Sequence, residues 1–113
     1  MEVDCGRMEN NMIKSKYFEM GTIVVTNRIN EAMTENYQFK QEVLFALENF
    51  SNKDWGELSA EDMQVNEDAL QYPEDLYLLG VYQTCRGKIY IITCRKSEKA
   101  GDNCTTVCFP DER

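Results

Sequence analysis

Hydrophobic and polar positions change period several times along the chain, and each change predicts an element. Segment 21–26 is a β-branched run of strand length. Asn27 can cap a short helix over 28–33, and Thr34 can cap a longer one. The apolar residues of this longer helix recur at helical spacing: Phe39, Val43, Leu47 and Phe50. The pattern predicts one strand followed by two helices.

A third helix is predicted by its start and stop signals. Ser59 is followed three residues later by Asp62, an approximate capping box. The helix must end before Pro73, because proline disfavours helical geometry in the preceding residue. One stripe of this helix carries Met63, Asn66 and Leu70.

The last third of the chain has the composition of three strands, over 76–84, 88–94 and 104–109. Residues 85–87 mark a tight hairpin between the first two. We expect the three to form an antiparallel meander in which Cys94 lies opposite Cys104.

This register divides the meander into two faces. Ile89, Ile91 and Val107 share the face that is the expected core. The other face is also more apolar than a solvated face should be, so we expect a helix, the tail or a partner to cover it in part. Burial of Tyr90 and Ile92 tests this expectation. The full second face is Tyr90, Ile92, Cys94, Cys104, Thr106 and Cys108.

Together these elements predict an α+β fold: a strand, two to three helices, then a three-stranded antiparallel meander. We expect the helices on one side of a largely antiparallel four-stranded sheet, with strand 21–26 at an edge. Residues 1–16 show no regular period and are predicted to be a flexible N-terminal tail. Residues 17–113 are predicted to form a single α+β domain.

Composition narrows the classes of function. The 113 residues are 42% hydrophobic and 28% charged, and no apolar stretch approaches the roughly 18 residues of a membrane helix. Five cysteines without a C-x-x-C pair predict reduced thiols, and we expect a cytoplasmic protein without membrane contact. The absence of histidine removes the commonest general base and zinc ligand, so we expect no enzyme and no cofactor.

Two groups of side chains suggest metal sites, each with a plainer alternative. Four thiols, Cys85, Cys94, Cys104 and Cys108, could bind zinc on the sheet, or simply pack as small apolar residues. Glu57, Glu61 and Asp62 could hold a divalent cation, although no D-x-D-x-D-G loop is present. We predict no metal in either place.

The only tryptophan lies in the turn before the third helix. Trp55 could anchor an interface from the surface, or it could fill the core while Gly56 supplies a positive φ angle. The sequence leaves both open.

Charge is concentrated in one segment. Residues 48–75 contain nine acids and one base, a net charge of −8 that equals the charge of the whole chain. Such a surface repels phosphate backbones and attracts basic grooves, although a solvated helix face is the plainer explanation. The candidate partner-binding residues are Asp54, Trp55, Glu57, Glu61, Asp62, Glu67, Asp68, Glu74 and Asp75.

Several short motifs, taken together, resemble a family of small proteins carried on bacterial plasmids, phages and conjugative elements. The resemblance covers about residues 21–112, and it carries over no catalytic residue. It implies a role against host defence, through binding of an effector such as a CRISPR nuclease or a restriction enzyme. The motifs are Asp54-Trp55-Gly56-Glu57-Leu58, Glu61-Asp62, Asn66-Glu67-Asp68-Ala69-Leu70, Ile91-Ile92-Thr93 and Thr105-Thr106-Val107-Cys108-Phe109-Pro110.

We therefore expect a non-enzymatic inhibitor, monomeric or homodimeric, that binds a basic groove of a nucleic-acid-handling host effector and no nucleic acid directly. One alternative is an accessory or regulatory subunit of a mobile-element complex that assembles through the second sheet face. Another is a small toxin-like nuclease, against which the acidic balance and the missing histidine argue.

Overall fold

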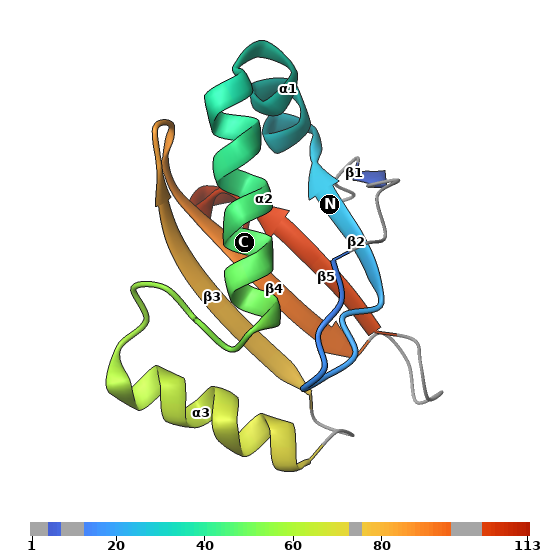
Figure 1. Ribbon diagram of the computed structural model, residues 1–113, viewed down its shortest axis with the longest axis vertical. Coiled ribbons are helices and arrows are strands. Elements are labelled where there is room, and N and C mark those ends of the chain that lie inside the picture. Colours follow the sequence, from blue (N-terminus) through green and yellow to red (C-terminus); the bar gives the residue numbers. More distant parts are fainter. Residues whose placement is uncertain (1–4, 8–12, 73–75, 96–102) are drawn as a thin grey trace.

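The computed structural model describes residues 5–7, 13–72, 76–95 and 103–113 (Figure 1). Within them the chain forms five strands, three α-helices and a short 3₁₀ turn, which confirms the α+β class. In chain order these are β1 (Cys5–Arg7), β2 (Thr22–Thr26), α1 (Asn27–Glu35), α2 (Tyr37–Ser51), α3 (Ala60–Gln71), β3 (Tyr77–Thr84), β4 (Gly87–Arg95), β5 (Asn103–Cys108) and η2 (Pro110–Glu112).

The strands form one mixed sheet in the order β1-β2-β5-β4-β3. β3 pairs with β4 and β4 with β5, both antiparallel, but β2 runs parallel to β5. The expectation of a largely antiparallel sheet holds for three of the four strand pairs, and the parallel pair of β2 with β5 makes the sheet mixed. The expected edge position of β2 is wrong, because β1 pairs with its outer side. Most of the predicted tail, residues 1–4 and 8–12, lies outside the described residues.

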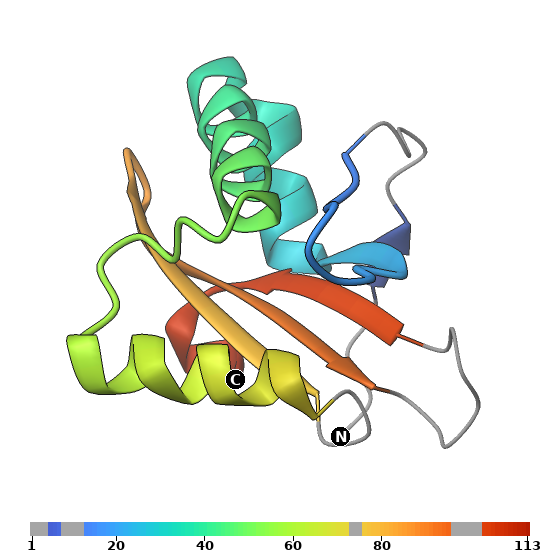
Figure 2. The ribbon, with the colours of Figure 1, turned by 60° about the horizontal axis from the view of Figure 1, so that its bottom comes forward.

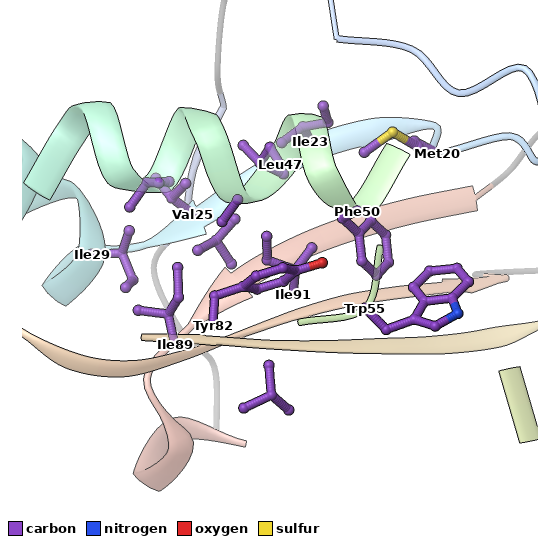
Figure 3. Packing of buried hydrophobic residues seen from close by; sticks show 14 of the residues in the cluster. Met20, Ile23, Val25, Ile29, Leu47, Phe50, Trp55, Tyr82, Ile89 and Ile91 are labelled. Carbon is purple, nitrogen blue, oxygen red and sulfur yellow. The ribbon is translucent and has the colours of Figure 1, made fainter. Parts of the chain in front are cut away.

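The register of the last two strands agrees with the prediction. Cys94 lies opposite Cys104, and Ile91 opposite Val107. On the first face, Ile89, Ile91 and Val107 are fully buried. The core between this face and α1 and α2 is completed by residues that include Ile23, Val25, Ile29, Leu47 and Phe50 (Figure 3).

The second face is covered in part, as expected. Tyr90 and Ile92 are half-buried, and Cys108 is buried. The C-terminal turn supplies some of the cover, since the Arg113 guanidinium lies 5.5 Å from the centre of the Tyr90 ring. The Glu112 carboxylate also accepts the Thr26 hydroxyl at 2.9 Å, which ties this turn to β2.

The helix starts differ from the sequence prediction at two of three places. Thr26, and not Asn27, caps α1, because its hydroxyl accepts the Ile29 N–H. Asn36, and not Thr34, caps α2, and the Thr34 hydroxyl donates to the Asn30 carbonyl instead. At α3 the predicted cap, Ser59, is confirmed.

The helices do not all lie on one side of the sheet. α1 and α2 cover the first face, whereas α3 lies along the outer side of β3, away from them (Figures 1 and 2). The single-layer arrangement expected from the sequence is therefore wrong for α3. No helix among residues that the structure describes has the length and apolar content needed to cross a membrane.

Candidate docking surface

α3 is attached to the sheet through a buried asparagine. The Asn66 side chain donates from Nδ2 to the Leu79 carbonyl oxygen at 2.8 Å, and its Oδ1 accepts the Leu79 N–H at 3.1 Å. A side-chain amide thus pairs with the strand as a neighbouring strand would. Met63 and Leu70 flank Asn66 on the same stripe and pack in part against the core. This fixes which face of α3 points to the sheet.

The loop before α3 pairs with the next outward-facing residue of β3. The Val81 N–H donates to the Trp55 carbonyl oxygen at 3.0 Å, and the Glu57 N–H donates to the Val81 carbonyl oxygen at 2.8 Å. Gly56 lies between them at φ +74°, and a Cβ there would be 1.9 Å from the Val81 carbonyl oxygen. Only glycine allows so close an approach.

Trp55 belongs to the core and not to the docking surface. Its side chain is 4% exposed and packs edge-on against Phe50, with ring centres 5.3 Å apart (Figure 3). Phe18 completes the aromatic cluster. The prediction that Trp55 binds a partner is therefore corrected, because its apolar surface is already buried within the chain.

The opposite face of α3 carries acids and apolar side chains together. Glu61, Val65 and Asp68, at positions i, i+4 and i+7, fall on one stripe of α3, and Tyr72 is the C-cap residue directly after the helix. We call these four residues the outer stripe. All four are exposed, Val65 by 58% and Tyr72 by 57%. Charge counting alone missed Val65 and Tyr72, although their spacing from Glu61 and Asp68 was a readable signal.

The remaining predicted acids lie around this stripe. Glu67 is on a flank of α3, where Lys53 pairs with it at 3.0 Å. Asp62 lies in the first turn, where an acid complements the helix dipole. Asp54 accepts the Gly56 N–H, and Glu57 accepts the Gln83 side-chain amide. The predicted positions Glu74 and Asp75 lie outside the described residues.

The four cysteines whose side chains the structure describes do not gather into one site. Cys94 and Cys104 face each other across β4 and β5, whereas Cys85 lies exposed at the hairpin tip between β3 and β4. Within the described ranges, no group of three or more cysteine and acidic side chains could hold a metal ion.

The hairpin tip is joined to α2 by a carboxylate. Glu42 accepts the Cys85 backbone N–H at 2.9 Å, and this bond, with one from the thiol, lowers the pKa of Glu42. The same carboxylate raises the pKa of the Cys85 thiol. A raised pKa disfavours the nucleophilic thiolate form of Cys85.

Comparison of the chain with protein-family models, with curated proteins and with solved structures gave no match.

Proposed function

We propose that the protein is a non-enzymatic interaction protein that docks a basic protein surface with the outer stripe of α3. The observation that carries the proposal is the exposure of Val65 on α3 and of Tyr72 at its end, together with Glu61 and Asp68. Two apolar side chains one heptad apart give an interface a contact centre, and the acids beside them select a basic partner.

The charge around the stripe favours the same class of partner. Asp54, Glu57 and Asp62 add exposed carboxylates at the beginning of α3. Lys53 is the only base among residues 48–75, and it is already paired with Glu67. A field of this sign accelerates association with a positively charged groove and opposes contact with a phosphate backbone.

A groove that binds nucleic acid has the required chemistry. With the resemblance to mobile-element proteins, this leads us to propose a nucleic-acid-handling effector of host defence as the partner. Assembly through the second sheet face has less support, because the C-terminal turn already covers Tyr90 on that face.

The test starts with affinity capture from a bacterial lysate that carries defence systems, at low and high salt, with identification by mass spectrometry. The retained partner is then titrated against Glu61→Gln/Asp68→Asn and against Val65→Ser. We expect each variant to bind at least about tenfold more weakly, with a smaller salt dependence for the charge variant.

The matched control is Glu31→Gln/Glu48→Gln, which removes two exposed acids from α1 and α2 and leaves α3 unchanged. If the control weakens binding as much as the α3 variants do, net charge rather than the outer stripe determines binding. Unchanged affinity and unchanged salt dependence in the charge variant would show that the stripe does not contact the partner.

A further inference from the structure

A second open surface lies between α2 and β3. It is a groove of about 450 Å³ lined by Phe45 and Ala46 on α2 and by Val81 and Tyr82 on β3, and of these two strand residues only Tyr82 shares the sheet face that α2 covers. Phe45 is 65% exposed, an unusual state for a phenylalanine beside a groove. This surface belongs to the α2 side of the sheet, so it is separate from the outer stripe of α3 (Figure 1).

The groove is kept open by backbone geometry. Gly56 lines it and cannot carry a side chain, because a Cβ would lie 1.9 Å from the Val81 carbonyl oxygen and 2.9 Å from the Tyr82 ring. The Tyr82 ring is itself held in place, since its hydroxyl donates to the Asp54 carbonyl oxygen at 2.7 Å. Ala46 on the facing helix is also small.

The rim of the groove is acidic. Glu42 and Glu57 are among the lining residues, and the rest of the lining in the described part of the chain is apolar or an uncharged amide. The Glu42 carboxylate accepts the Cys85 backbone N–H at the hairpin tip, and this bond lowers the pKa of Glu42 and favours its charged form. An occupant with positive charge beside an apolar side chain complements this surface.

The strand edge in the groove favours an extended occupant. The outward N–H and C=O groups of Leu79 and Val81 are already bonded to Asn66 and to the loop. Alternation along a strand directs the N–H and C=O of Gln83 to the same outer side, and Gln83 lines the groove. A peptide backbone lying in the groove can pair there, as in recognition by strand addition.

We propose that this groove binds a short extended peptide segment of a partner protein, with an aliphatic side chain against Phe45 and Tyr82 and an arginine or lysine beside Glu42 and Glu57. This goes beyond the docking role of α3, because it needs neither the outer stripe nor its partner.

The test uses a labelled hexapeptide of alternating leucine and arginine. Two comparison peptides replace arginine by glutamate or leucine by serine. We expect the leucine-arginine peptide alone to shift the amide NMR signals of Gly56, Val81 and Gln83 in a saturable way. Phe45→Ala should weaken its binding about tenfold, as truncation of a central aromatic does. The control Tyr37→Ala removes another exposed aromatic from α2, outside the groove, and should leave binding unchanged.

Three results would overturn the proposal. The first is equal binding of the glutamate peptide or the serine peptide. The second is an undiminished affinity in Phe45→Ala, provided that its spectrum remains that of the folded protein. The third is concentration-dependent broadening of the groove signals without peptide, because a second copy of the chain would then be the occupant.

A separate variant distinguishes this proposal from the docking role of α3. Glu61→Gln/Asp68→Asn should still bind the peptide, because neither residue lines the groove. If this variant no longer binds the peptide, and if the peptide shifts the NMR signals of α3 in the wild-type protein, the groove proposal is wrong while the docking role stands.

Discussion

Replacement of Asn66 by aspartate exchanges the Nδ2 amide group for a carboxylate oxygen at the contact between α3 and the sheet. Asn66 is 2% exposed, and its two hydrogen bonds to Leu79 use one donor and one acceptor. In Asn66→Asp the acceptor remains, but the donor becomes a carboxylate oxygen that faces the Leu79 carbonyl oxygen. We expect a loss of about 2–4 kcal/mol at pH 7, from one lost bond and one buried carbonyl group left without a donor.

The loss depends on pH in a defined direction. A protonated carboxyl can donate its O–H to the Leu79 carbonyl, so the folded variant favours the protonated form. The pKa of the introduced carboxyl is therefore raised in the folded state above its unfolded value of about 3.9. The variant loses stability as the pH rises through this raised pKa and recovers it as the pH falls toward about 4.

Urea unfolding followed by tryptophan fluorescence measures this effect, because Trp55 is buried and is the only tryptophan. The difference from wild type should shrink by at least about 0.6 kcal/mol between pH 7 and pH 4.5, which is the part of the roughly 1.4 kcal/mol of a one-unit pKa shift that is recovered at that pH. Asn30→Asp makes the same charge change at an exposed position of α1 and should stay within about 0.5 kcal/mol of wild type. A pH-independent loss in Asn66→Asp would refute the amide pairing.

Two further substitutions probe the loop and the hairpin tip. In the same unfolding assay, Gly56→Ala should lower the free energy of unfolding by at least about 2 kcal/mol more than Gly87→Ala does. Both glycines have positive φ, but of the two only Gly56 would bring a Cβ against backbone atoms. Equal losses of stability would exclude the close approach as the cause. Glu42→Gln should speed the alkylation of Cys85 at pH 8, measured by peptide mass spectrometry, because loss of the carboxylate lowers the pKa of the thiol. Glu48→Gln, at an exposed position of α2, is the control. An equal rate in Glu42→Gln and wild type would contradict the contact between Glu42 and the thiol.

Local patterns predicted the elements well where each pattern is repeated within one segment. The β3–β4 hairpin is specified by two long apolar runs around residues 85–87, and its strands begin and end within about one residue of the predicted bounds. The side of α3 that faces the sheet was also predicted from spacing, since Met63, Asn66 and Leu70 do face the sheet.

Features that depend on contacts between distant segments could not be predicted from the sequence. The parallel pairing of β2 with β5 joins segments some eighty residues apart, and no local signal distinguishes it from an edge position. β1 has three residues, too few for a period of two to be recognised. Thr26 and Asn27 are adjacent and both suit an N-cap, so only the backbone angles decide between them.

The candidate surface was predicted by its charge but not by its shape. The nine acids of residues 48–75 indicated where the surface lies, yet charge alone did not distinguish the outer stripe from Glu67, which pairs with Lys53. The phase of the helix provides that distinction, and a buried asparagine sets the phase. The spacing of Met63, Asn66 and Leu70 predicted which side of α3 faces the sheet, but not the two hydrogen bonds from Asn66 to Leu79 that fix it.

Protection of a strand edge is the plainest alternative explanation for acids beside β3, since charged side chains keep exposed edges from pairing with other chains. At Leu79 and Val81 that need is already met, because Asn66 and the loop at Gly56 occupy the outward groups of these two residues. The outer stripe points away from this edge and adds nothing to its cover. Nor does edge protection explain why Val65 and Tyr72 are exposed among the acids. A docking role accounts for both observations, because a partner's basic groove would cover the apolar pair and neutralise the acids beside it.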